Sequence, residues 1–285
     1  MIGVFGLFLP GLVGLSDTGV VGVDPGFSVA VVDVGETGVF GYRVTYLGPG
    51  VGFFVLSVDN GSVYPGSFSL LSGQAATVYV TRAEGVPGVY DSVLTVRELG
   101  SGETVNVTAR LVVASECIRG STTGGRLVLV ADSINVSVEV NATGQTCARL
   151  CVLPENPLPE YVPQGSVSLD RYFDIRVGRP DHVSWPITVK MNYSEQEVVG
   201  EGLNELSLGL SYWNGTGMES FNDTGVDTGI HQVYAFPEEN ETGGSIVMAI
   251  ASLDVTPIPE PPATSIILVA SITGLLALFY WRKPL

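Results

Sequence analysis

The sequence predicts an all-β fold, in which two antiparallel β-sandwich domains precede one C-terminal transmembrane α-helix. Short segments with alternating apolar and polar residues recur along the chain, as in strands that bury one face. The 36 Gly and 17 Pro among 285 residues supply frequent turns between these segments. The chain then ends in an uncharged apolar run of 19 residues, Ala263–Trp281, which is long enough to cross a bilayer.

Residues 1–21 are predicted to form a signal-peptide-like apolar segment. Met1–Leu15 contains no cation and has the length of a signal-peptide hydrophobic region rather than a membrane span. The basic residues that normally precede such a region are missing. Two alternatives therefore stay open: Met1 is not the true start, or this run is a first β-strand.

Residues 22–114 are predicted to form an Ig-like β-sandwich. In Phe40–Tyr46 the residues Phe40, Tyr42, Val44 and Tyr46 share one face, and Arg43 and Thr45 take the other. Seven short strands in about 90 residues are typical of an Ig-like sandwich. The predicted strands cover 27–32, 39–47, 52–58, 67–71, 75–81, 88–97 and 103–113.

Several of these segments also resemble a known family. Val34–Thr37, Leu71–Val80 and Pro87–Tyr90 resemble the turns and strands of CARDB-like and related Ig-like modules of prokaryotic surface proteins. In those modules a Gly-Gln-Ser/Ala turn leads into one strand, as at Gly73–Ala75 here. The resemblance covers about 80 residues and implies an Ig-like fold and a place on a cell surface.

Residues 115–254 are predicted to form a second β-sandwich, with a Pro-rich connection at 153–164. Alternating strands are expected around 134–141, 172–177, 187–193 and 206–212, with one or two helical turns within 194–204. The order of these segments resembles a module that precedes the C-terminal tail of archaeal and bacterial surface proteins. The chain departs from that pattern because no Trp follows Asn214-Gly-Thr216 and because its closing strand is Gly244–Ala249.

Asparagine usage points to export. Eight of the ten Asn head an Asn-x-Ser/Thr triplet, whereas Asn156 and Asn204 do not. This density predicts N-linked glycans on an extracellular protein. The predicted glycosylation sites are Asn60, Asn106, Asn135, Asn141, Asn192, Asn214, Asn222 and Asn240.

Three cysteines, Cys117, Cys147 and Cys151, predict one disulfide and one spare thiol in an oxidising exterior. Cys147 and Cys151 are four residues apart on one predicted strand, about 13 Å, and so cannot bridge each other. Cys117–Cys147 is the preferred pair, and Cys117–Cys151 is the alternative. A metal site of three Cys is not favoured because no His stands nearby.

The charge balance excludes one class of partner. The chain has 29 acidic and 13 basic residues, a net charge of −16, and such a surface repels phosphate backbones. We therefore expect no nucleic acid among its partners. The expected partners are the membrane, N-linked glycans, other cell-envelope proteins and a sortase-like enzyme.

The C-terminal tail has three parts. Residues 255–262 are a Pro-rich linker with Pro259-Glu260-Pro261, residues 263–281 are the predicted transmembrane helix, and residues 282–285 are a short basic cytoplasmic end containing Arg282 and Lys283. This order resembles the PEP-CTERM and archaeal PEF-CTERM sorting tails. The resemblance implies cleavage near Pro259–Pro261 by a membrane sortase. A permanent single-pass anchor is the alternative, and both place the sandwiches outside the cell.

The sequence patterns that could indicate a catalytic or metal site are weak. Asp-Thr-Gly triplets begin at Asp17, Asp223 and Asp227, but they lack the strand context of pepsin-like proteases, and such triplets are also common turns. Asp223 and Asp227 with Asn222 lack the spacing of a calcium loop. His182 and His231 show no ligand spacing, and Trp185 and Trp213 are expected in a core rather than on a sugar-binding platform.

The sequence thus predicts a non-catalytic, N-glycosylated cell-surface protein with no cofactor or metal. Its sandwiches would serve structural or adhesive contact, anchored or sorted by the C-terminal helix. The alternatives are an ectodomain that binds a glycan or solute, and a surface hydrolase built on Asp17 and Asp223.

Overall fold

The computed structural model describes residues 20–241 and 243–252. The predicted signal-like segment up to residue 19, the linker at 255–262, the transmembrane helix at 263–281 and the basic end at 282–285 lie outside them. The same holds for Asp17, for the sorting motif Pro259, Glu260 and Pro261, and for Arg282 and Lys283. In the described ranges, no helix is both long and apolar enough to cross a membrane.

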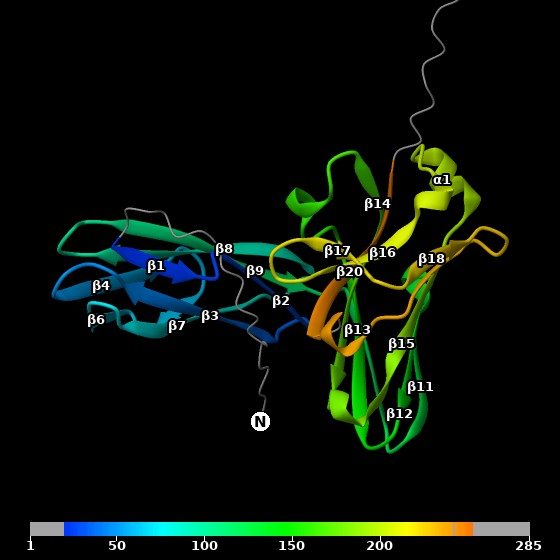
Figure 1. The fold of residues 1–285 in the computed structure, drawn as a ribbon, viewed down its shortest axis with the longest axis horizontal. Helices are drawn as coiled ribbons and strands as arrows, with labels where there is room; N and C mark the ends of the chain where they lie inside the picture. Colours follow the sequence, from blue (N-terminus) through cyan, green and yellow to red (C-terminus); the bar gives the residue numbers. More distant parts are fainter. Residues whose placement is uncertain (1–19, 242, 253–285) are drawn as a thin grey trace, which may run out of the picture.

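The described chain is all-β and forms two β-sandwiches, as the sequence predicts (Figure 1). The break between them falls between β9 and β10, at Ala114–Ser115. In Figure 1 the strands of the first sandwich run across the view, and those of the second run crosswise to them.

The N-terminal sandwich pairs a four-stranded sheet with a five-stranded sheet. The four-stranded sheet has the order β1 (Val21–Asp24), β3 (Thr37–Tyr46), β7 (Ala75–Ala83), β5 (Ser62–Tyr64). The five-stranded sheet has the order β2 (Phe27–Val32), β9 (Thr104–Val113), β8 (Gly88–Glu98), β4 (Val51–Val58), β6 (Ser67–Leu71). All seven predicted strands are present, and β1 and β5 are additional.

The C-terminal sandwich pairs a six-stranded sheet with another five-stranded sheet. The six-stranded sheet has the order β10 (Glu116–Thr122), β13 (Thr146–Leu153), β14 (Ser166–Gly178), β20 (Gly243–Ser252), β16 (Gly209–Trp213), β17 (Met218–Ser220). The other has the order β11 (Gly125–Ala131), β12 (Val136–Ala142), β15 (Val183–Asn192), β19 (Gln232–Ala235), β18 (Thr224–Asp227).

Helical structure is confined to short segments of the C-terminal sandwich. The single α-helix of the described residues, α1 (Glu195–Gly200), begins with a capping box between Ser194 and Glu197 and buries Val198. The 3₁₀ turns are η1 (Asp132–Ile134), η2 (Pro159–Tyr161), η3 (Pro180–His182), η4 (Glu205–Ser207) and η5 (Glu239–Glu241).

The prediction of purely antiparallel sheets is wrong at one pair. β2 lies parallel to β9, with Phe27 opposite Thr108 and Val32 opposite Val113. β2 continues into β3, which belongs to the other sheet, so no hairpin fixes its direction relative to β9.

Each sandwich has its own core. In the first, the predicted face of β3 is buried, and Phe40, Tyr42, Val44 and Tyr46 pack against both sheets. In the second, the core gathers residues such as Leu150, Phe173 and Ile187. A third buried cluster joins the two sandwiches and is the most distinctive part of the molecule.

Candidate functional site at the joint between the two sandwiches

The joint forms where the outer faces of two sheets meet. Along β2, Ala30 and Val32 point into the N-terminal core, whereas Val31 packs with the C-terminal sandwich. The strand period of two gives each face of β2 a different neighbour. The buried residues of the joint are Val31, Val112, Ala114, Cys151, Leu153, Leu158, Tyr172, Trp213, Ile246, Met248 and Ile250.

Three aromatic rings lie at one side of this cluster. Phe27 of β2 meets the ring of Trp213 edge-on at 5.9 Å between centroids, and Tyr161 contacts Trp213 at 4.5 Å. The guanidinium of Arg110 lies over the Phe27 ring, 5.2 Å from its centroid. Trp213 is therefore a packing residue of the joint, which agrees with the expectation that it is not a sugar platform.

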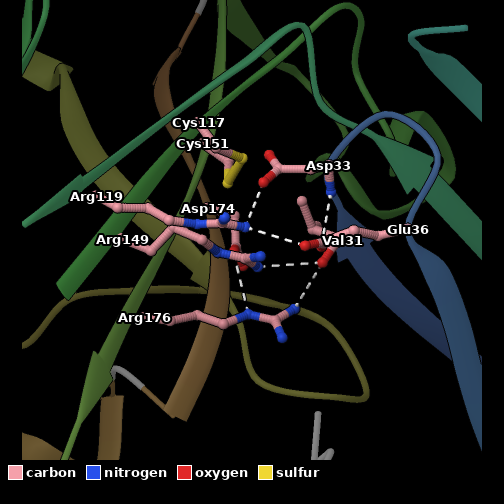
Figure 2. Close-up of polar contacts among 9 residues, drawn as sticks. All are labelled: Val31, Asp33, Glu36, Cys117, Arg119, Arg149, Cys151, Asp174 and Arg176. Atoms are coloured by element: carbon pink, nitrogen blue, oxygen red, sulfur yellow. Dashed lines mark hydrogen bonds and ion pairs between the residues drawn. A yellow bond between two sulfur atoms is a disulfide. The ribbon is translucent and has the colours of Figure 1, made fainter. Parts of the chain in front are cut away.

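A buried carboxylate lies at the centre of the joint. Asp174 of β14 is 0% exposed, and its Oδ2 accepts hydrogen bonds from Arg149 Nη2 at 3.2 Å and Arg176 Nε at 3.1 Å (Figure 2). Arg149 and Arg176 stand directly opposite each other on β13 and β14, so Asp174 offsets the repulsion between two adjacent cations.

The same two arginines hold the other sandwich. Arg149 Nη2 donates to the carbonyl oxygen of Val31 at 3.1 Å, and Arg176 Nη2 donates to it at 3.3 Å (Figure 2). Of the buried side-chain polar atoms in the described ranges, Asp174 Oδ1 and Arg149 Nε have no hydrogen-bond partner. Because buried charges are costly to desolvate, this arrangement fixes one geometry rather than adding much stability.

A second ionic contact lies beside the disulfide. Arg119 of β10 donates to Asp33 and, at 3.3 Å, to Glu36 Oε1, and both acids belong to the turn between β2 and β3 (Figure 2). The carboxylate of Asp33 and the sulfurs of Cys117 and Cys151 lie within 4.8 Å of one another. The two sulfurs are bonded to each other and are therefore not thiolates, the form that ligates metals.

The preferred disulfide prediction, Cys117–Cys147, is wrong. The bond joins Cys117 to Cys151, which was the alternative, and Cys147 is free and exposed. Cys117 stands directly opposite Cys151 in the β10–β13 ladder, whereas Cys147 stands opposite Ser121. β11 and β12 come between these strands in the sequence, so the sequence alone could not supply this register.

A third ionic contact between the two sandwiches is centred on Arg110. Arg110 of β9 binds Asp91 through two hydrogen bonds of 2.7 and 2.9 Å. Its Nη1 also reaches across to Glu160 Oε1 at 2.6 Å and the carbonyl of Pro157 at 2.7 Å. The hydrogen bond with Asp91 and the charge of Glu160 raise the pKa of Arg110, although burial opposes this.

The joint could have been recognised from a break in alternation. Val29-Ala-Val-Val32 and Leu111-Val-Val-Ala114 are continuous apolar runs at neighbouring strand ends, and such runs are typical of strands buried on both faces. The arginines and Asp174 gave no comparable signal, since charged residues on an outer face normally meet water.

The eight sequon asparagines are not members of the joint, although Asn214 directly follows its residue Trp213. Seven of them are exposed, and Asn214 is half-buried because its Oδ1 accepts hydrogen bonds from the backbone of Thr216 and Gly217. Asn135 precedes β12 in a left-handed turn instead of lying on the strand. The exposed ones are Asn60, Asn106, Asn135, Asn141, Asn192, Asn222 and Asn240.

The other candidate residues do not converge. Asp223 and Asp227 are exposed at the two ends of β18, and Asp227 Oδ1 accepts from Gly229 N in a turn. His182 bonds the carbonyl of Gln145 at 2.9 Å, whereas His231 lies 3.1 Å from Glu205. The hydroxyl of Tyr193 also bonds Glu205 at 2.8 Å, and these two neighbours lower the pKa of Glu205.

Trp185 also has a structural role. Its indole Nε1 donates to the carbonyl of Pro180 at 3.1 Å, and its ring packs against the core of the C-terminal sandwich. The pairing of Asp17 with Asp223, on which the hydrolase alternative depended, involves a residue outside the described ranges.

No family model matches the chain, and no curated protein matches it. Solved structures do match. WR4, an MSP family member from C. elegans, is 16% identical over 34% of this chain and 100% of its own, with a TM-score of 0.26. PapD-like domain 7 of human CEP192 is 13% identical over 39% of this chain and 96% of its own, with a TM-score of 0.31. The YadV chaperone is 8% identical over 60% of this chain and 92% of its own, with a TM-score of 0.27. At these identities and TM-scores the matches carry no inference about the function of this chain, and the β-sandwich fold rests on its own sheet topology.

Proposed function

We propose that this chain is a non-catalytic, N-glycosylated cell-surface protein that displays two β-sandwiches in one fixed orientation for structural or adhesive contact. The observation that carries this proposal is the separation of two kinds of surface. The apolar and ionic residues of the joint bind the sandwiches to each other. Seven of the eight sequon asparagines are exposed positions outside this cluster, and Asn214 alone adjoins it, next to Trp213.

The exposure of the sequons supports glycosylation. An exposed Asn accepts a glycan without displacing core side chains, and seven of the eight meet this condition. Asn106 and Asn141 project from the outer faces of strands, where a sugar chain extends into solvent. Six of the eight belong to the C-terminal sandwich, which would carry most of the glycan coat.

The disulfide supports an extracellular location. Disulfides persist in oxidising compartments, and this one links the edge strand β10 to β13 beside the joint. It therefore braces the strand that carries Arg119, which contacts Asp33 of the other sandwich.

The remaining support comes from the sequence. The apolar run 263–281 and the basic residues Arg282 and Lys283 would anchor the chain in the membrane. Alternatively, a sortase-like enzyme would cut at Pro259-Glu260-Pro261, as in PEP-CTERM and archaeal PEF-CTERM tails. Under both variants the C-terminal sandwich lies nearer the membrane and the N-terminal sandwich projects outward, where it meets other cell-envelope proteins.

Surface exposure can be tested on intact cells of the native host. Protease added outside is expected to remove the sandwiches, and the protein is expected to fractionate with the envelope. Enzymatic or chemical deglycosylation is expected to lower its apparent mass. Full protection from protease together with recovery in the cytosol would contradict the proposal.

A second candidate function, glycan binding, is favoured by one observation. Tyr64 and Tyr79 face each other across β5 and β7 and are 76% and 45% exposed. Adjacent exposed aromatic rings offer an apolar surface on which a sugar ring can stack. Slower migration of the wild type in polysaccharide gels, abolished by Tyr64→Ala and unaffected by Val86→Ala at another exposed position, would support this function.

A further inference from the structure

One continuous segment, Ser62–Leu71, forms an edge of both N-terminal sheets. β5 ends the four-stranded sheet and β6 ends the five-stranded sheet, with only Pro65 and Gly66 between them. In Figure 1, β4 and β6 lie at the end of the N-terminal sandwich that is remote from the C-terminal sandwich. This edge is therefore free of the joint.

The edge segment lies in a long uncharged stretch. Between Asp59 and Arg82 no residue is charged, although the chain as a whole carries −16. Proteins usually protect exposed edge strands with lysines, inward-pointing charges or bulges, because an open edge pairs readily with another strand. β6 has no charge of its own and none in the residues that flank it up to these two positions.

The backbone of β6 is open on its outer side. Leu56 N bonds Gly66 O at 2.9 Å and Ser72 N bonds Gly50 O at 3.1 Å, so the even-numbered residues of β6 bond β4. In an antiparallel ladder the backbone N–H and C=O groups of the intervening, odd-numbered residues point away from the paired strand. Ser67 and Ser69 thus direct their N–H and C=O groups to the open edge, where no other described strand pairs with β6.

An apolar surface adjoins this edge. Val51 of β4 stands directly opposite Leu71 of β6, and both are exposed. Phe53 is 57% exposed, and its carbonyl accepts a hydrogen bond from the backbone of Leu99, another exposed apolar residue. This is the outer face of the sheet whose opposite edge, at β2, packs against the C-terminal sandwich through Val31.

We propose that β6 pairs with β6 of a second copy of this chain. Antiparallel pairing about a two-fold axis is self-complementary, so each protomer supplies the same strand. The two five-stranded sheets would become one, and the apolar surface of one protomer would continue into that of its partner. This inference needs neither the membrane nor the glycans and so stands apart from the proposed function.

The charge distribution directs a second copy to this edge. Two chains of −16 repel each other over most of their surfaces, and the uncharged edge is where they approach at least cost. A cationic partner would instead be drawn to the C-terminal sandwich, where 18 acidic residues stand against seven basic ones between residues 115 and 252.

The first test measures self-association of the full-length chain by light scattering over a concentration series. The wild type is expected to form dimers as concentration rises. Ser69→Lys places two like charges across the paired strands and is expected to weaken dimerisation at least about tenfold. The matched control is Ser220→Lys, which adds the same charge to an exposed position on the edge strand β17 and is expected to dimerise as the wild type does.

The second test uses cross-linking, so that the result does not depend on the lysine variant alone. Ser69→Cys in a Cys147→Ser background is expected to give dimers with a short bis-maleimide, whereas Ser220→Cys in the same background is not. A wild type that stays monomeric at every concentration would overturn the proposal. Equal dimerisation of Ser69→Lys and wild type, or equal cross-linking of the two cysteine variants, would also overturn it. The same holds if the Ser69→Cys variant cross-links only to a different envelope protein.

Discussion

Between residues 20 and 114, eight acidic residues stand against four arginines, whereas between residues 115 and 252 eighteen stand against seven basic residues. The N-terminal sandwich has two sequons and the C-terminal sandwich has six. Of the exposed large apolar residues in the described ranges, eleven belong to the first sandwich and five to the second. One fold thus carries two different surfaces.

This difference suits the two sandwiches to different kinds of contact with their surroundings. A strongly acidic surface with many sequons stays solvated and resists close contact with other acidic surfaces. A weakly charged surface with exposed Phe53, Leu71 and Tyr64 is suited to contact. The joint fixes the orientation of the weakly charged surface relative to the acidic, sequon-rich one.

The largest expected effect comes from the centre of the joint. Asp174→Ala leaves the partly buried Arg149 and Arg176 opposite each other without their shared, fully buried carboxylate. We expect a loss of about 3–5 kcal/mol in the free energy of unfolding, measured by guanidinium unfolding of the full-length chain. Asp181→Ala, at a mostly exposed carboxylate, is the control and should change stability by less than about 0.5 kcal/mol. Equal stability of the two variants would contradict this role of Asp174.

The apolar part of the joint comes next. Trp213→Ala removes a ring that packs against both Phe27 and Tyr161, and we expect it to cost about 3 kcal/mol in the free energy of unfolding. It should also enlarge the maximum dimension in small-angle scattering, because the sandwiches then move apart. Trp185→Ala is the control, since Trp185 packs within one sandwich and should leave their separation unchanged. An increase in both variants would show that the effect is not specific to the joint.

The disulfide is expected to have an effect similar in size to that of Trp213. It closes a loop with a sequence separation of 34, and replacing Cys117 and Cys151 together by Ser should cost about 2–4 kcal/mol. Cys147→Ser, at an exposed free thiol, should have almost no effect. Thermal unfolding of both variants under oxidising and reducing conditions measures the contribution of the disulfide to stability. A reductant that destabilises the double Ser variant as much as the wild type would argue against this role.

The smallest expected effect concerns acid. Backbone N–H groups of Ser101 and Gly100 donate to Glu98 and lower its pKa from 4.5 to about 2. A carboxylate with a lowered pKa stabilises the fold above its unfolded pKa and loses that contribution as pH falls towards its folded pKa. The wild type should therefore lose stability between about pH 4.5 and 2.

Glu98→Gln tests this prediction, because the amide does not titrate. The melting temperature of the variant should fall less steeply with pH over this window than that of the wild type. Glu103→Gln, at a carboxylate that precedes β9 and accepts a single hydrogen bond from Val20 N, is the control. Parallel pH profiles for wild type and Glu98→Gln would count against the assignment.

Local pattern was enough to predict most strands. In β3 the alternation of Phe40, Tyr42, Val44 and Tyr46 matched the buried face, since one side of the strand meets the core and the other meets water. β1 and β5 were missed because four and three residues are too few to show alternation. The parallel pair β2–β9 was missed because nothing local encodes the direction of distant strands.

The apolar strands of the joint carried a local signal, but its ionic contacts could not be predicted from the sequence, because they join distant parts of the chain. Asp174 and Val31 are linked through Arg149 and Arg176, although more than 100 residues separate the two arginines from Val31. The register that brings Cys117 opposite Cys151 is likewise set by the β10–β13 pairing. The sequons, in contrast, are visible locally, and their exposure follows from the polar faces and turns that contain them.

The most direct test of the proposed function is site-by-site mass spectrometry of the protein extracted from its native host. We predict glycan mass on the sequon peptides, with the greater number of occupied sites in the C-terminal sandwich. Occupancy at Asn135, Asn141, Asn192 and Asn240 would support a coated sandwich that carries an exposed contact domain. Unmodified Asn at all eight sequons, in protein recovered from the cytosol, would contradict it.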